Sequence, residues 1–129
     1  MTNRKRDATV ARATGVELKK VNNILFMPRA VLLKVKPSQY NIWKEWCTEL
    51  SGALYSEAKK TLIEEKIIQE LTIGFEIEGE CYVIGYMDGE CLPANMSRTI
   101  NQKHKAMKEQ CLEMVGEIEV LANIKCDSC

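Results

Sequence analysis

A long β-hairpin is predicted by residues 64–88, which read EEKIIQELTIGFEIEGECYVIGYMD. In residues 71–77, apolar side chains alternate with polar or small ones, which is the period of a strand with one buried face. Glu78-Gly79 then has the composition of a two-residue turn, because glycine supplies the positive φ that such turns need. This turn pairs aromatic or β-branched side chains across the hairpin: Phe75 with Tyr82, Ile73 with Ile84, and Leu71 with Tyr86. We therefore expect this set of side chains to form the buried face and to fix the register.

Helices and strands are predicted on both sides of the hairpin. β-branched residues and alternation predict a strand at 31–36, and alternation also predicts a strand at 118–124. Apolar residues at helical spacing predict a helix at 40–54 with Trp43 and Trp46 on its buried side, a second helical stretch at 56–62, and a helix from about 95 to 115.

The order is strand, helix, strand, strand, helix, strand. With right-handed crossovers, this order predicts an α+β fold of the ferredoxin-like βαββαβ type, a four-stranded antiparallel sheet with two helices on one face. We expect this domain to occupy residues 29–125, preceded by a basic N-terminal extension at 1–28 and followed by a short tail at 126–129.

Several stretches resemble a known family. Residues 79–86 (GECYVIGY), 100–105 (INQKHK) and 43–46 (WKEW), together with Lys36-Pro37 and Cys111, are similar to a small uncharacterised bacterial family, a domain of unknown function, in the dimeric α/β-barrel superfamily. The resemblance covers roughly residues 30–115. It implies a ferredoxin-like fold and a cytoplasmic homodimer. It implies no activity, because a fold shared with cofactor-independent monooxygenases and isomerases does not fix a function.

Composition restricts the class of protein. The 129 residues are 46% hydrophobic and 28% charged with no net charge, which is typical of one globular domain and makes a nucleic-acid partner unexpected. No apolar run is long enough for a membrane span or suited to a signal peptide, so we expect a cytoplasmic protein without a membrane partner. Cys47, Cys81, Cys91 and Cys111 are then expected to be reduced thiols.

The N-terminal extension concentrates positive charge. Residues 1–29 carry seven Lys or Arg and two acids. Such a segment is typical of a flexible or partly helical solvated tail, and Met27 is a plausible alternative start. A basic arm that contacts phosphates is the alternative. We expect the domain to fold without residues 1–26.

His104 is the first candidate for chemistry. It is the only histidine, so no multi-histidine metal site is expected, and neither a metal nor a cofactor is predicted. It lies on the apolar stripe of its helix, where it is either a hydrogen-bonded core residue or a general base in a pocket between the helices and the sheet. Glu65 could face inward and pair with it.

The other candidates are Tyr82, as a catalytic hydroxyl, and Tyr86, Trp43 and Arg98, as ligand-binding side chains. Each also has a structural reading. The tyrosines could be core residues with hydroxyls at the rim, Trp43 could be core, and Arg98 could face water. Cys126 and Cys129 have the spacing of a redox motif or of half a zinc site, but they do not open a helix after a strand, and no second close pair accompanies them.

Two functions of different classes remain open. One is a small-molecule-binding protein or cofactor-independent enzyme with a pocket near His104. The other is an interaction or regulatory module that dimerises through its sheet. A homodimer is expected because Val83 and Met87, with Cys81 and Gly85, would place apolar side chains on the sheet face opposite the Tyr82 set, which a monomer would leave in water.

Overall fold

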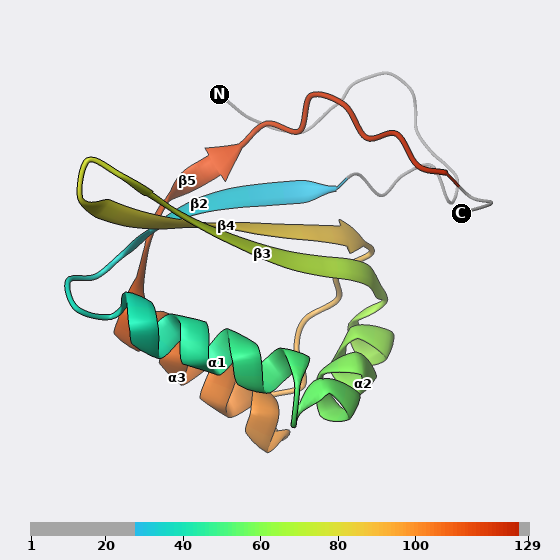
Figure 1. Ribbon diagram of the computed structural model, residues 1–129. Coiled ribbons are helices and arrows are strands. Elements are labelled where there is room, and N and C mark those ends of the chain that lie inside the picture. The colour runs from blue at the N-terminus through green and yellow to red at the C-terminus, as the bar shows by residue number, and fades with distance from the viewer. Residues whose placement is uncertain (1–27, 127–129) are drawn as a thin grey trace.

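Four antiparallel strands form one sheet in residues 28–126, the part of the chain that the computed structural model describes (Figure 1). The elements are β2 (Arg29–Val35), α1 (Tyr40–Ser51), α2 (Tyr55–Glu65), β3 (Ile67–Ile77), β4 (Glu80–Gly89), α3 (Thr99–Cys111) and β5 (Leu112–Ile118). The strand order is β3-β4-β2-β5, so β4 and β2 are central and β3 and β5 are the edges. The prediction of an α+β protein with a four-stranded antiparallel sheet is confirmed.

The predicted hairpin register is confirmed. Phe75 pairs with Tyr82, Ile73 with Ile84, and Leu71 with Tyr86. The turn residues have φ angles of 51° at Glu78 and 81° at Gly79. Positive φ at both central turn positions matches the right-handed twist of the flanking strands, so the turn chemistry fixes the register as the sequence indicated.

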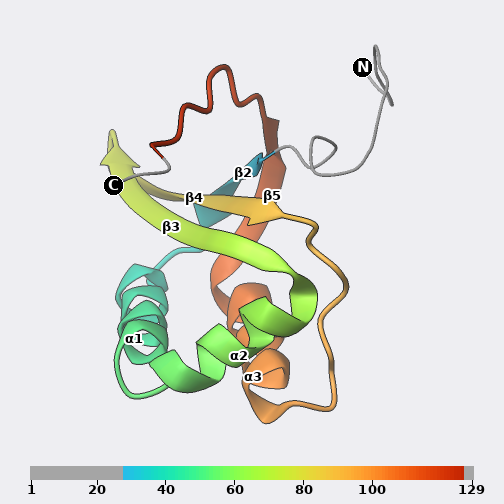
Figure 2. The ribbon, with the colours of Figure 1, turned by 90° about the vertical axis from the view of Figure 1, so that its right-hand side faces the viewer.

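All three helices of the described residues cover the same face of the sheet (Figures 1 and 2). The sequence predicted two helices, with a second stretch continuing the first. Instead, α1 ends at its C-cap Gly52, whose backbone N–H donates to the Glu49 carbonyl, and α2 starts three residues later. α2 itself ends at Lys66, whose left-handed φ of 55° turns the chain directly into β3.

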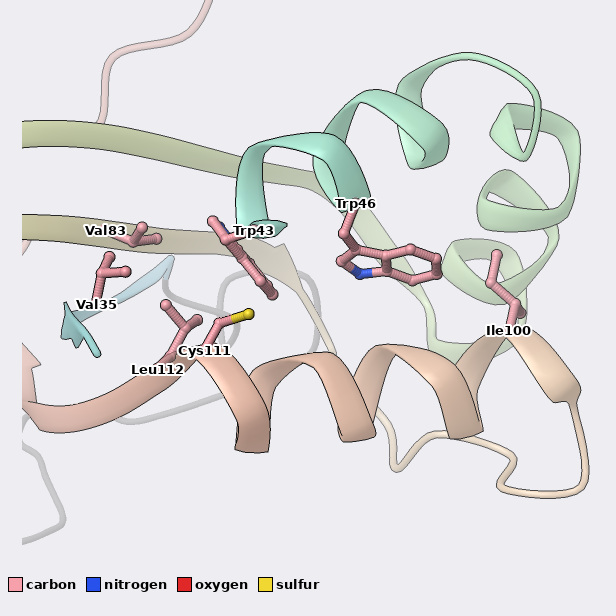
Figure 3. Close-up of a cluster of buried hydrophobic side chains, with 7 residues drawn as sticks. All are labelled: Val35, Trp43, Trp46, Val83, Ile100, Cys111 and Leu112. Carbon is pink, nitrogen blue, oxygen red and sulfur yellow. The ribbon is translucent and has the colours of Figure 1, made fainter. Parts of the chain in front are cut away.

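The core lies between the helices and the central strands (Figure 3). Trp43 and Trp46 of α1 are 4% and 1% exposed, and they pack in one cluster with Val35, Val83, Ile100, Cys111 and Leu112. The two indoles are the largest side chains of this cluster, and burial of an aromatic side chain removes about 150–250 Å² from water.

The prediction of which hairpin face is buried is wrong, and so is the prediction that Val83 and Met87 lie on a face that a monomer would leave in water. Val83 is 1% exposed and Cys81 packs against the core, whereas Leu71, Ile73 and Ile77 are 44%, 45% and 55% exposed. The face under the helices therefore carries the smaller side chains. The large rings of α1 fill that layer and leave room only for small partners: the Tyr40 ring lies where any Cβ on Gly74 would have to go.

The last strand was also predicted in the wrong place. The helix expected to reach residue 115 ends at Cys111, and β5 pairs with β2 over Leu112–Ile118 instead of 118–124. The reason is a bulge: Leu33 pairs with Met114 and Leu32 with Gly116, so Val115 is an extra residue that interrupts the alternation. In the sequence alone, Met114 falls on the apolar stripe of the preceding helix, and for that reason the helix was predicted to continue to residue 115.

The predictions for residues 1–27 and for Cys129 lie outside the described residues. Cys47, Cys81, Cys91 and Cys111 are free thiols, as expected.

Candidate functional site

His104 lies between the two tryptophans of α1. The Trp46 indole Nε1–H donates a hydrogen bond of 2.8 Å to His104 Nδ1. Both indole ring centroids lie 6.0 Å from the imidazole centroid, with the rings tilted by 38° for Trp43 and 33° for Trp46. Because Nδ1 accepts a hydrogen bond, the ring is the neutral tautomer with its proton on Nε2. The polar ring that the sequence placed on an apolar stripe is thus satisfied by a buried donor.

The surroundings of His104 disfavour its charged form. Burial, and to a smaller extent the positive charge of Lys108 one turn along α3, lower the pKa of His104 from 6.5 to about 4. A general base works best when its pKa is near the working pH, so an imidazole with this pKa is a weak base, and at neutral pH it is not in the imidazolium form that acts as a general acid. The geometry favours the core reading of His104 over the general-base reading.

Tyr82 and Tyr86 do not meet His104. Both are on the face of β4 opposite Val83, and Val83 is in the core with the helices. The Tyr82 ring stacks on Phe75 of the neighbouring strand, with centroids 5.5 Å apart and planes at 20°. The structure therefore separates the two tyrosines from the histidine by the thickness of the sheet.

Glu65, Trp43 and Arg98 take three different positions. Glu65 is the last residue of α2, and its backbone carbonyl accepts from the Leu92 N–H at 2.7 Å. Trp43 contacts the His104 ring, and its buried Nε1 makes no hydrogen bond with a described residue. Arg98 is held by Glu64 in a two-pronged ion pair, with Nε and Nη2 at 2.8 and 2.6 Å from the carboxylate oxygens. Of the sequence-predicted candidates, only His104 and Trp43 are brought into contact.

Two charged residues that the sequence reasoning missed act on Glu65. Side chains alternate along a strand, so Glu70 shares the helix-covered face of β3 with Thr72 and Gly74. Lys108 lies on α3. Burial raises the pKa of Glu65, and the charges of Glu70 and Glu64 raise it further, while Lys108 lowers it. Burial also raises the pKa of Glu70, and Lys108 opposes that shift. Glu70 remains exposed to solvent, so water weakens these effects.

We call Glu65, Glu70 and Lys108 the charged cluster. It joins the C-terminal end of α2, the edge strand β3 and helix α3. The sequence contained the signal for it, because Glu70 has the parity of Gly74, but the wrong assignment of the buried face hid that signal. Two carboxyls with raised pKa values beside one ammonium could hold a polar ligand by hydrogen bonds.

A separate cavity of about 400 Å³ opens between the β2–α1 loop and the hairpin tip. Lys36, Ser38, Tyr40, Glu80 and Cys81 are among its lining residues. None of the sequence-predicted site residues lines it.

Comparison with known proteins supplies no assignment: no family model matches the chain, and neither a curated protein nor a solved structure is significantly similar to it. Within residues 28–126, no group of three or more His, Cys, Asp or Glu side chains is arranged to hold a metal ion. None of the helices in this range has the length and apolar character needed to cross a membrane.

Proposed function

We propose that this protein is an interaction module that forms a homodimer through the sheet face opposite the helices. We call this surface the open face. Its apolar and aromatic side chains come from all four strands: Leu32, Leu71, Ile73, Phe75, Ile77, Tyr82, Ile84, Tyr86 and Ile118. This gathering of apolar side chains on one face is the observation that carries the proposal.

A second copy is the occupant that this surface suits. Monomeric proteins seldom leave a contiguous apolar face of this kind in water. The hairpin register places the large side chains in cross-strand pairs, so the face is rigid and needs little ordering on association. Charged side chains lie at one end of the open face, where Lys34 Nζ and Glu80 Oε1 form an ion pair of 3.1 Å. An apolar centre with a charged rim is the usual anatomy of an interface.

The proposal extends to the fold class. The two central strands β2 and β4 are the first and third of the four in chain order, every neighbouring pair is antiparallel, and the helices share one face. These features support a ferredoxin-like domain, and the apolar open face supports the dimeric α/β-barrel arrangement that the sequence resemblance implies.

The environment of His104 supports an interaction role over a catalytic one. The ring is hydrogen-bonded to Trp46, and its pKa of about 4 leaves it uncharged at neutral pH. Tyr82 and Tyr86, which were predicted to belong to the same site as His104, lie instead on the open face. Within the dimer, Tyr82 and Tyr86 would act as anchors, since tyrosine is enriched at the energetic centre of interfaces.

Analytical ultracentrifugation of the full chain with one charge placed on the open face tests the proposal. Ile73 is 45% exposed at the middle of β3, and Ile73→Glu should raise the dimer dissociation constant at least about hundredfold. In a twofold interface the lost burial counts twice, at roughly 1.5 kcal/mol or more per isoleucine.

The matched control is Ile63→Glu. Ile63 is 74% exposed on α2, in the helix layer, so the same chemical change there should leave dimerisation unaltered. A wild-type chain that stays monomeric, or equal effects of the two substitutions, would contradict the proposal.

A second candidate function is binding of a small polar molecule, and the charged cluster is the observation that favours it. The two carboxylates could accept hydrogen bonds from a polar ligand, and the Lys108 ammonium could donate one to it. A thermal-shift screen against a metabolite library tests it, because a ligand that binds the folded state raises the melting temperature. A hit whose shift survives in both Glu70→Gln and Lys108→Met would remove the cluster from the account.

A further inference from the structure

We infer that residues 119–126, which we call the C-terminal arm, contribute contacts to the second copy in the dimer, through Leu121 and Ile124. This inference rests on the proposed dimer and adds a segment to it that lies outside the sheet.

The position of the arm is the first observation. After β5 the chain adopts no regular structure, and it runs over the side of the sheet away from the helices in both views (Figures 1 and 2). Any molecule that packs on the open face must therefore meet the arm.

An ion pair between a half-exposed lysine and a buried carboxylate anchors the arm near its end. Lys125 Nζ lies 2.5 Å from Asp88 Oδ2, and the Asp88 side chain is only 5% exposed. Asp88 has the parity of Tyr86 near the C-terminal end of the central strand β4, so this contact ties the arm to one end of the open face. Because the carboxylate is buried, the pair is screened little by salt and holds the arm in place more firmly than a surface pair would.

The apolar side chains of the anchored arm do not reach their own sheet. Leu121 is 86% exposed and Ile124 is 93% exposed. An arm that is held over an apolar face, with its own apolar side chains turned to solvent, presents them to whatever covers that face. Single exposed apolar side chains are ordinary, but two on one short anchored segment add to the apolar surface already on the open face.

The sheet alone offers less area than a stable dimer interface usually buries, and the arm can add to it. The strands comprise 7, 11, 10 and 7 residues. At about 3.3 Å per residue and about 4.8 Å between strands, the sheet has a footprint of about 550 Å². A stable interface buries about 800 Å² per partner. Leu121 and Ile124 can supply on the order of 100 Å² each, which covers most of the difference. Twofold symmetry then places each arm against the other copy's sheet.

Sedimentation of three full-length variants tests the inference. Ile124→Asp should raise the dimer dissociation constant at least tenfold, and Leu121→Asp should act in the same direction. Ile63→Asp is the matched control, because it alters an isoleucine of comparable exposure in the helix layer and should change the constant less than twofold. Since Ile124 is almost fully exposed in the single chain, its substitution should leave the fold and the far-ultraviolet circular dichroism unchanged.

A chain that ends at Ile118 provides a second measurement, with at least the effect of Ile124→Asp. Unchanged or tighter dimerisation in the arm variants, while Ile73→Glu still disrupts the dimer, would overturn the arm inference and leave the proposed function standing. A wild-type chain that is monomeric at all concentrations would overturn both.

Discussion

Replacing His104 by asparagine should remove a pH dependence from the stability of the protein. The pKa of His104 is about 4 in the folded chain and near 6.5 when the imidazole is exposed, so the unfolded chain binds the proton more tightly. Stability from this residue is therefore complete above pH 6.5 and is lost as the pH falls through the window down to about 4. At 1.36 kcal/mol for each pKa unit, the loss amounts to about 3 kcal/mol.

Asparagine is the informative substitution because its Oδ1 is attached at the position that Nδ1 holds in histidine. It can accept the hydrogen bond from Trp46 Nε1, but it does not titrate. His104→Leu serves as the contrast: it leaves the Trp46 N–H buried without an acceptor, and we expect a loss of about 1–3 kcal/mol at every pH.

Urea denaturation at pH 7.5, 6, 5 and 4 is the assay, with the wild-type chain and both variants measured in parallel. The free energy of unfolding of the wild type minus that of His104→Asn should fall by about 3 kcal/mol across this series. Subtraction cancels the titration of Glu65 and Glu70, which both chains retain. A difference that stays flat to within about 0.5 kcal/mol would refute the account of a buried neutral imidazole, because a shift in pKa must appear as a change in stability.

Three further changes test the packing and the backbone. Gly74→Ala should destabilise the fold by about 1–3 kcal/mol in urea denaturation, because the new methyl group meets the Tyr40 ring; the loss should be smaller in a Tyr40→Phe background, which lacks the nearest atom, and equal losses would contradict this packing. Gly79→Ala should cost about 1 kcal/mol by the same assay, since φ there is 81°, and a neutral result would mean that the turn has another conformation. Glu78→Asn should raise the melting temperature slightly, because asparagine tolerates the φ of 51° better than glutamate does; a lower melting temperature would show that the Glu78 side chain has a role of its own.

Local chemistry made the hairpin predictable. The turn at Glu78-Gly79 and the alternation on both strands determine each other, so the register of β3 and β4 could be derived pair by pair. The α1 stripe was equally readable, because Trp43 and Trp46 recur at helical spacing and both are buried.

The face of the hairpin that meets the helices could not be read from the same pattern. Alternation separates two sets of side chains but does not say which set is covered. Here the larger set, with Leu71, Ile73 and Tyr82, lies on the open face, and the smaller set accommodates the indoles of α1. The covered face depends on the volume of the helix side chains, which is a property of the assembled layers.

The same limit explains the missed site residues. Because Leu71 and Ile73 were expected on the buried face, alternation put Glu70 on the other face of the strand, so its relation to Glu65 and Lys108 could not be anticipated. His104 was found because it is a single imidazole on an apolar stripe. Its partner was not, since the indole N–H of Trp46 lies 58 positions away in the chain.

Isotope-filtered NMR on a mixed dimer tests most directly whether the open face joins two copies. Equal amounts of ¹³C-labelled and unlabelled full chain are combined above the dissociation constant, and only contacts between copies are recorded. The account predicts intermolecular contacts at the methyl groups of Leu71, Ile73 and Ile84, on the open face. Contacts that are absent from these methyl groups and present at Ile63, or a sample with no intermolecular contact at any concentration, would contradict it.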